Sequence, residues 1–323
     1  MGKRIVVLGG AGLIGTHLCL RLLSEGNDLF CVDIRDAADS PLLTEALGQS
    51  RFRYVTHNII NSFDIRCDEL YNLTVPTRLR YDRTLPVETL KVNVLGAINV
   101  LETARTEHAR VLYASSGDIY NTSFSDTTTG PIISNTSKQI LAEGKRAGET
   151  FHRAYRNEHG VDCRIARIFN TYGTGGSIED QRVVMKMTIA ALRNRDLVIY
   201  GSGEQLRTFC WVEDMVDGLV RLMQAPPTEQ TRTIDLGASH EISIRMLAEK
   251  IIAITGSHSR ITHTEAYNYD SLRRTPDLSA AQRELNWRAE TSLIEGLKRT
   301  VEYAEKELSR TAWAEMSWIE MNA

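Results

Sequence analysis

The sequence lacks a long hydrophobic run. No stretch of its 323 residues approaches the roughly 18 consecutive apolar residues that span a bilayer. The N-terminus enters a strand-like segment almost at once, without the apolar region or the cleavage site of a signal peptide. We therefore expect a cytoplasmic protein with no membrane partner.

Cysteine is scarce and shows no pattern. The five cysteines are odd in number and never stand in metal-ligand spacing; they are Cys19, Cys31, Cys67, Cys163 and Cys210. This pattern argues against a disulfide framework and against a structural zinc site. We expect reduced thiols and no metal ion.

An excess of one charge is also missing. The chain has 38 Lys and Arg residues against 41 Asp and Glu residues, a formal net charge of −3. Such a balance provides no broad basic field for a nucleic acid. We expect no nucleic-acid partner.

What is present begins with a strand and a glycine-rich turn. Residues 4–8 are a short apolar run typical of a buried parallel strand, and the glycines of residues 9–15 follow it directly. An amphipathic helix then continues to about residue 25. Glycines at such a turn permit a sharp reversal and a close approach of the backbone to a pyrophosphate. The arrangement predicts a dinucleotide site.

The next strand supports that prediction and favours one cofactor. Residues 29–32 form a second apolar run that ends at Asp33, 18 residues after Gly15. A carboxylate at this point accepts both ribose hydroxyls of NAD and repels the 2′-phosphate of NADP. Arg35 is the one nearby feature that favours NADP instead. We expect NAD.

Strand and helix patterns alternate through the first half of the chain. Further strands are expected at 52–56, 68–73, 110–115 and 161–168, with helices at about 86–107 and 137–159. This alternation predicts an α/β fold, a Rossmann-type doubly wound parallel sheet. An irregular stretch at 116–136, rich in Ser, Thr and Asp, is expected to form an active-site loop.

After about residue 168 the alternation loosens. We expect a smaller, interleaved C-terminal substrate-binding lobe that places a cleft over the carboxyl ends of the strands. The first domain is predicted at 1–168 plus about 208–236, and the lobe at about 169–207 plus 237–310, followed by a tail at 311–323. The elements expected here are helices near 182–194, 212–223, 243–255 and 291–308, and strands at 197–200 and 234–236.

Several stretches together resemble the extended short-chain dehydrogenase/reductase family, also called the NAD-dependent epimerase/dehydratase family. They are, in chain order, residues 9–15, 71–73, 93–96, 114–120, 143–146, 164–173, 182–184, 207–209 and 273–277. The match extends over about residues 3–307. Within the family, the UDP-glucuronate decarboxylase branch is the most similar to this sequence. The resemblance implies an NAD-dependent enzyme that acts on a UDP-sugar.

The resemblance also implies catalytic roles. In the family a Tyr, its pKa lowered by a Lys four residues later, takes the proton of a sugar hydroxyl while hydride passes to NAD. Ser116 matches the residue that helps to hold this hydroxyl. Asp118 stands where the decarboxylases usually carry a Glu for the step that releases the C5 carboxylate. Lys145 matches the Lys that binds the nicotinamide ribose.

Position 141 departs from the family pattern, because Leu141 stands where the Tyr is expected. Tyr120 and Tyr172 are the candidate replacement acids or bases. Further departures cluster in the same region: Gly117 replaces a Ser, residues 74–81 are unusually basic, and the loop before Lys145 is short. We interpret this cluster as retuning for another substrate or step.

The resemblance also predicts residues for two binding sites. The expected cofactor-binding residues are Gly9, Gly12, Leu13, Ile14, Gly15, Asp33, Asn58, Ile59, Leu73, Asn93 and Lys145. The expected residues for the uracil, ribose and diphosphate of the UDP-sugar are Asn170, Arg182, Val183, Tyr200, Arg207 and Arg274. Arginine suits a diphosphate because its planar guanidinium makes paired, charge-assisted hydrogen bonds.

The family's usual assembly implies a homodimer in which helices 86–107 and 137–159 pair into a four-helix bundle. Beyond the match lies an apolar-rich tail that includes Trp313, Met316, Trp318, Ile319 and Met321. This tail either docks on its own lobe as a helix or contacts another chain.

Three functions fit the sequence. The first is an NAD-dependent enzyme that oxidises C4 of a UDP-sugar and then decarboxylates, epimerises or dehydrates it with a rearranged acid/base set. The second is an enzyme that keeps NAD as a structural or transient partner and performs a non-redox step on an activated sugar or glycoside. The third is a non-catalytic subunit that binds both ligands.

Overall fold

The structure is a computed structural model that describes residues 2–37, 40–75, 85–120, 137–229, 232–266 and 272–321. Of residues 137, 138 and 311–321 it describes the backbone. Three predicted features therefore lie at least partly outside the described residues. They are most of the basic segment 74–81, the active-site loop from residue 121 to 136, and the side chains of the tail.

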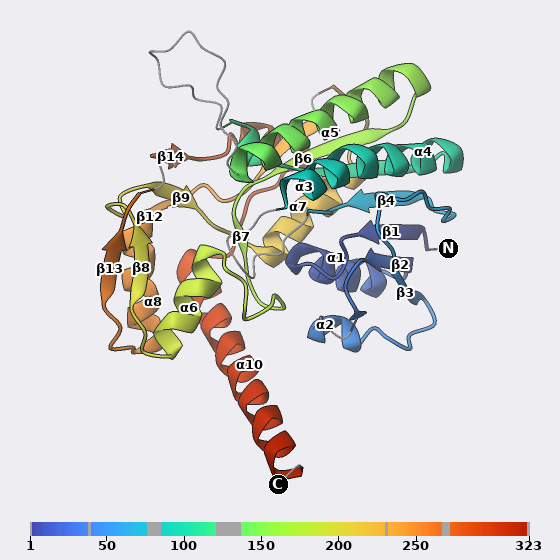
Figure 1. Ribbon diagram of the computed structural model, residues 1–323. Coiled ribbons are helices and arrows are strands. Elements are labelled where there is room, and N and C mark those ends of the chain that lie inside the picture. The colour runs from blue at the N-terminus through green and yellow to red at the C-terminus, as the bar shows by residue number, and fades with distance from the viewer. Residues whose placement is uncertain are drawn as a thin grey trace.

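A seven-stranded parallel sheet forms the centre of the fold (Figure 1). Its spatial order is β11 (Thr233–Leu236), β6 (Cys163–Ile168), β5 (Arg110–Ser116), β4 (Glu69–Asn72), β1 (Arg4–Leu8), β2 (Asp28–Asp33) and β3 (Phe52–Thr56). Every neighbouring pair runs parallel. The chain changes direction across the sheet between β1 and β4, where such folds open a ligand crevice. The predicted Rossmann-type doubly wound fold is confirmed.

Helices cover both faces of this sheet, so its strands are apolar on both sides. On one face α1 (Leu13–Ser24) and α7 (Val212–Gln224) contribute the fully buried Leu18 and Leu219 to the core. On the other face α4 (Ala97–Glu107) contributes the fully buried Val100 and packs beside α5 (Ser137–His159). Leu18 and Val100, two of the apolar residues whose pattern predicted α1 and α4, therefore lie in the core.

The helix predicted over 86–107 is interrupted. The structure divides it into α3 (Pro86–Lys91), the π-helix η2 (Val92–Gly96) and α4. Inside η2 the Asn93 side chain donates from Nδ2 to the carbonyl oxygen of Thr89 at 2.8 Å. One extra residue in a turn barely changes apolar periodicity, so the sequence predicted a single helix. Such π-turns occur often beside functional sites.

The second lobe combines short strands with longer helices. β8 (Leu197–Tyr200) pairs with β13 (Ile261–Thr264), β9 (Leu206–Thr208) with β12 (Glu241–Ser243) and β14 (Arg273–Arg274), and β7 (Thr171–Tyr172) with β10 (Cys210–Trp211). The lobe's helices are α6 (Val183–Leu192), α8 (Ile244–Thr255) and α10 (Leu293–Met321). Shorter elements are α2 (Pro41–Thr44), α9 (Ser279–Leu285) and the 3₁₀ turn η3 (Gly117–Tyr120). Most of the short strands were not predicted, because two to four residues carry no usable period.

The C-terminal helix is longer than the sequence suggested. The prediction ended it near residue 308, whereas α10 continues as one helix to Met321. Figure 1 shows its C-terminal half running away from the body of the molecule. The backbone of the tail is thus a continuation of α10.

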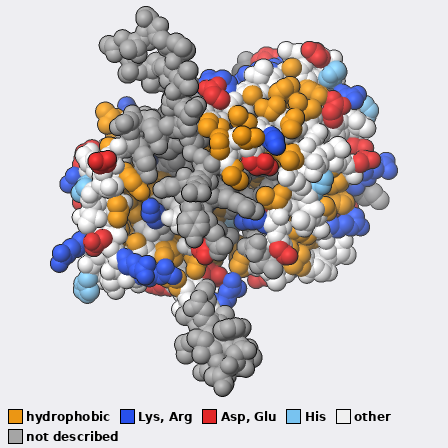
Figure 2. Space-filling model, viewed as in Figure 1, with side chains coloured by type: hydrophobic (Ala, Val, Ile, Leu, Met, Phe, Trp, Pro, Cys, Tyr) orange, Lys and Arg blue, Asp and Glu red, His pale blue; other side chains and the backbone are white. Residues whose placement is uncertain are grey.

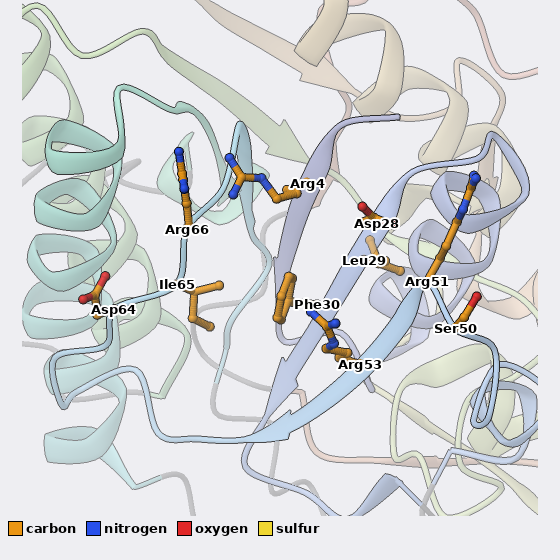
Figure 3. Close-up of a pocket in the computed structure, with 10 residues that line it drawn as sticks. All are labelled: Arg4, Asp28, Leu29, Phe30, Ser50, Arg51, Arg53, Asp64, Ile65 and Arg66. Carbon is orange, nitrogen blue, oxygen red and sulfur yellow. The ribbon is translucent and has the colours of Figure 1, made fainter. Parts of the chain in front are cut away.

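A hollow of about 410 Å³ lies at the amino-terminal end of the sheet, beside β1, β2 and β3. Figure 3 shows the charged side chains that line it, which include Arg4, Arg51, Arg53 and Arg66 together with Asp28 and Asp64. No helix lies between β3 and β4 to cover this part of the sheet. The hollow is at the opposite end of the strands from the predicted site.

Candidate active site

A large cleft lies at the carboxyl ends of the strands, between the sheet and the second lobe. Its volume is about 1770 Å³, and it is lined by residues from the turn after β1 and from β2, β5, α5, α6 and β14. The predicted residues that it brings together are Gly9, Gly12, Leu13, Ile14, Gly15, Asp33, Asn58, Ile59, Leu73, Ser116, Asp118, Lys145, Asn170, Arg182, Val183, Tyr200, Arg207 and Arg274. Asn93 and Tyr120 are the two predicted residues that are not in the lining.

The glycine-rich turn forms a cradle that side chains would fill. Gly9 adopts a φ of +76°, which favours glycine. A Cβ at Gly15 would collide with the carbonyl oxygen of Gly9. Gly12 caps α1 without any side-chain hydrogen bond, so no side chain competes for the amides of the first turn. These features fit a diphosphate at a helix N-terminus.

Asp33 is held at the end of β2 by the turn itself. Its Oδ2 accepts from the backbone N–H of Ala11 at 3.0 Å, and its Oδ1 accepts from the N–H of Arg35 at 3.2 Å. The carboxylate lines the cleft, in the place where it can receive ribose hydroxyls. The Arg35 guanidinium lies 3.6 Å from the Asp33 carboxylate. Arg35, the one residue whose charge favoured NADP, is therefore partly engaged by Asp33.

A substitution in the glycine-rich turn should weaken both NAD binding and stability, and the two effects can be measured separately. Gly15→Ala is expected to weaken dinucleotide binding at least tenfold and to cost about 1–3 kcal/mol of stability, since the added methyl group has no space. Calorimetric titration with NAD and urea denaturation measure the two effects. Gly176→Ala is the matched control, because its Cβ meets Leu13 Cδ1 at an ordinary 3.5 Å. Equal NAD affinity in Gly15→Ala and wild type would contradict the assignment of this turn.

Leu141 and Lys145 both line the cleft from α5. The Lys145 side chain is fully buried, and its Nζ donates to the carbonyl oxygens of Ala114 at 2.7 Å and Thr74 at 3.1 Å. Its amine also lies 4.8 Å from the centre of the Tyr113 ring. Burial lowers the pKa of Lys145 to about 7, against an opposing effect from Glu149. The structure thus places an apolar side chain at position 141 and an easily deprotonated amine at position 145, both in the cleft.

Asp118 joins the two lobes across the cleft. Ser116 Oγ donates to Asp118 Oδ2 at 3.0 Å, and the Arg274 guanidinium forms an ion pair with Asp118 Oδ1. Arg274 also donates to Asn170 Oδ1 at 3.1 Å. Four residues predicted separately, as catalytic or as substrate-binding, therefore form one hydrogen-bonded group.

The hydroxyls of both tyrosines considered as replacements already have partners, although Tyr172 itself lines the cleft. The Tyr120 hydroxyl donates to Asp235 Oδ1 at 2.8 Å and accepts from Arg167 at 2.6 Å. The Tyr172 hydroxyl donates to the carbonyl oxygen of Leu293 at 3.3 Å, inside the core of the second lobe. Burial raises the pKa of both phenols, which opposes use as a base near neutral pH.

The second lobe supplies the remaining predicted side chains. Arg182, just before α6, pairs with Asp180, and its Nε donates to Asp180 Oδ2 at 2.7 Å. Arg207 is buried on β9 and donates to the carbonyl oxygen of Leu206 at 2.6 Å. Lys186 lies 5.6 Å from the centre of the Tyr200 ring. This side of the cleft therefore carries two cations at α6 and one on β9.

Sequence reasoning missed some lining residues and misplaced one. Gln205, Lys186 and Phe209 line the cleft. Lys186 is on the predicted helix α6, and Gln205 and Phe209 flank the three-residue strand β9, which was not predicted. Asn93, predicted to bind the cofactor, is buried in η2 and accepts from the Tyr113 hydroxyl at 3.2 Å. Both polar atoms of the Asn93 side chain therefore have partners within the protein.

Within the described part of the chain, no helix is long and apolar enough to cross a membrane. The same residues contain no cluster of three or more His, Cys, Asp or Glu side chains suited to a metal ion. The five cysteines are buried, free thiols.

Comparison with known proteins agrees with this geometry. Residues 5–237 match the model of the NAD dependent epimerase/dehydratase family. UDP-glucuronic acid decarboxylase 1 of Xenopus tropicalis is 34% identical over 314 residues, which cover 96% of this chain and 74% of the relative. UDP-glucuronic acid decarboxylase 6 of Arabidopsis thaliana is 35% identical over 299 residues, covering 91% and 86%.

Solved structures share the fold. An epimerase from Methanothermobacter thermautotrophicus, Mth375, has a TM-score of 0.82 at 25% identity and covers 96% of this chain and 95% of its own. UDP-glucuronic acid 4-epimerase from Bacillus cereus, solved with UDP-glucuronic acid and NAD, has a TM-score of 0.78 at 20% identity, covering 94% and 99%. The chain therefore belongs to the NAD dependent epimerase/dehydratase family, which confirms the predicted family and makes the protein an enzyme with NAD as its cofactor.

Proposed function

We propose that this enzyme oxidises C4 of UDP-glucuronate, or of a closely related UDP-sugar, and then decarboxylates or epimerises the oxidised sugar. The observation that carries the proposal is the meeting of a dinucleotide cradle, the Ser116–Asp118 pair and Arg274 in one cleft. The names of the relatives support it, since they are UDP-glucuronic acid decarboxylases.

The cofactor site uses residues of the first domain. The amides at the start of α1 would hold the diphosphate, and Asp33 would hold the adenosine ribose. In its protonated form Lys145 would donate to the nicotinamide ribose. NAD bound there supplies the acceptor for the hydride that leaves C4.

Removal of the C4 hydroxyl proton needs a base, and the described cleft offers Lys145. A neutral amine that donates its two hydrogens to Ala114 and Thr74 keeps one lone pair. A pKa of about 7 matches the pH at which a general base works best. Ser116 would hold the hydroxyl while its proton moves to the amine.

Asp118 and Arg274 belong to the second step. A uronate carboxylate entering the cleft is a natural partner for the Arg274 guanidinium. In decarboxylation the bond from C5 to the carboxylate breaks and its electron pair moves to the C4 carbonyl, carbon dioxide leaves, and C5 takes a proton. We assign Asp118 to this step, with Asn170, Arg182, Val183, Tyr200 and Arg207 holding the UDP moiety.

The outer helices support a homodimer. Figure 2 shows hydrophobic side chains gathered over the region of α3, α4 and α5. Exposed apolar residues there include Leu85, Val87, Leu90 and Leu95, with Val87 63% exposed. Such a patch marks an interaction surface. We propose that the dimer pairs through α4 and α5. The proposal also includes a cytoplasmic location and the predicted domain boundaries.

The decisive experiment combines purified protein with UDP-glucuronate. We expect NAD to become reduced on addition of the sugar, and we expect carbon dioxide to be released if the second step is decarboxylation. Transient reduction of NAD, followed by return of the hydride to C4 and appearance of the 4-epimer without carbon dioxide, would favour epimerisation. A changed sugar with no involvement of NAD would indicate the non-redox enzyme. Tight binding of both ligands with no turnover would indicate the non-catalytic subunit and contradict the proposal.

A further inference from the structure

Tyr120 belongs to a line of polar side chains that runs behind the cleft. Ser115 on β5 is paired with Arg167 on β6, and Arg167 with Asp235 on β11. These three residues therefore lie at one level across three neighbouring strands, near their carboxyl ends. Tyr120, at the end of η3, places its hydroxyl between Arg167 and Asp235.

We propose that Tyr120 is a positioning residue, which fixes the turn that carries Asp118 and the segment that carries Arg274. The role of the Asp118–Arg274 pair in turnover rests on the proposed function. The structural part of the inference rests on the contacts alone.

One end of the line is anchored in α5. Glu149 is buried, 1% exposed, and accepts from Ser115 Oγ at 2.6 Å and from Arg167 at 2.8 and 2.9 Å. Burial opposes ionisation of Glu149, but the bonds from Arg167 and Ser115 outweigh it and lower the pKa of this carboxyl. Arg167 is therefore held by a fixed negative charge on the helix that also carries Lys145.

The other end of the line reaches the second lobe. Asp235 Oδ2 accepts from the backbone N–H of Asp277 at 3.4 Å, three residues after Arg274. Because Asp235 Oδ1 accepts from the Tyr120 hydroxyl, one carboxylate joins the end of η3 to the segment that follows β14. The two partners of the pair across the cleft, Asp118 and Arg274, are thus tied together from behind.

The ring of Tyr120 is fixed as well. It stacks on Phe169, with ring centres 6.2 Å apart, and the Arg167 guanidinium lies 5.0 Å from its centre. Arg146 on α5 donates to the carbonyl oxygen of Ile119 at 3.0 Å and so holds the same turn. The hydroxyl has one donor and one acceptor partner. A proton-transfer role would require it to break these bonds.

Tyr120→Phe tests the proposal, because it keeps the stacked ring and removes the two hydrogen bonds. We expect kcat to fall about tenfold, as a small misplacement of reacting groups does, with NAD affinity unchanged within about twofold. The pH profile should keep both its limbs. Loss of a limb would show that Tyr120 is itself an acid or base and would overturn the proposal, as would an unchanged kcat. Tyr155→Phe is the matched control, since it removes a hydroxyl that donates to Glu102 at 2.6 Å.

A second measurement needs no turnover. If the Tyr120 hydroxyl holds the Asp118–Arg274 pair, Arg274→Gln should lower the urea midpoint of unfolding less in Tyr120→Phe than in wild type. Equal shifts in the two backgrounds would overturn the positioning role. If wild type shows no turnover of UDP-glucuronate, the proposed function fails, and the urea midpoints still decide this inference.

Discussion

Leu141→Tyr should raise the rate of C4 oxidation of UDP-glucuronate by about 10²–10⁴, the usual contribution of a positioned general acid or base. Leu141 lines the cleft one helical turn before Lys145, so a phenol at this position would stand beside the buried amine. Below about pH 7, where the amine of Lys145 is protonated, its charge would lower the pKa of this phenol. The variant would then have the pair of groups that the family uses. Initial rates of NAD reduction measure the gain.

Leu141→Phe is the control for size. It introduces the same ring without the hydroxyl and is expected to leave the rate within about threefold of wild type, since it brings no titratable group. An equal gain in both variants would mean that packing near Leu141 limits the native rate. A fall in activity of Leu141→Tyr below wild type would mean that the native reaction uses the space beside Leu141, which contradicts our assignment.

The dinucleotide half of the site could be predicted because its information is local. Gly9, Gly15 and Asp33 lie within one strand, one turn and one helix, and their spacing determines where each points. All three line the cleft, with Asp33 held by the N–H of Ala11 in the turn. The parallel sheet was predictable for a similar reason, since apolar runs alternate with amphipathic helices.

The acid/base half could be predicted only as a set of candidates. The pair of Asp118 with Arg274 joins residues 156 positions apart, and Tyr120 reaches Asp235 across 115 positions. No period or spacing in the sequence links such residues. They meet only because the fold brings η3, β11 and β14 together. The sequence could therefore nominate Tyr120 as a replacement for the phenol, but it could not show that Arg167 and Asp235 occupy its hydroxyl.

The buried amine of Lys145 has the second large expected effect. Lys145→Met removes the proposed base and should lower kcat by about 10³ at neutral pH. In wild type, kcat/KM should rise as the pH passes through about 7, where the amine loses its proton. Glu149, which raises the pKa of Lys145, is neutralised by Arg167, and the neighbouring Tyr113 stays protonated because burial raises its pKa. Lys306→Met, at a side chain 74% exposed, is the control.

Stability provides a test of this amine that needs no substrate. In the unfolded chain a lysine keeps its proton up to about pH 10.4, whereas the folded amine has lost it above about 7. Between these values the unfolded state binds more protons, so wild type should gain stability relative to Lys145→Met as the pH rises. Below about pH 7 the difference in stability between wild type and Lys145→Met should be constant. A difference that stays flat from pH 7 to 10 would mean that the buried amine is an ordinary ammonium ion, and Lys145 would then bind the cofactor without accepting the proton.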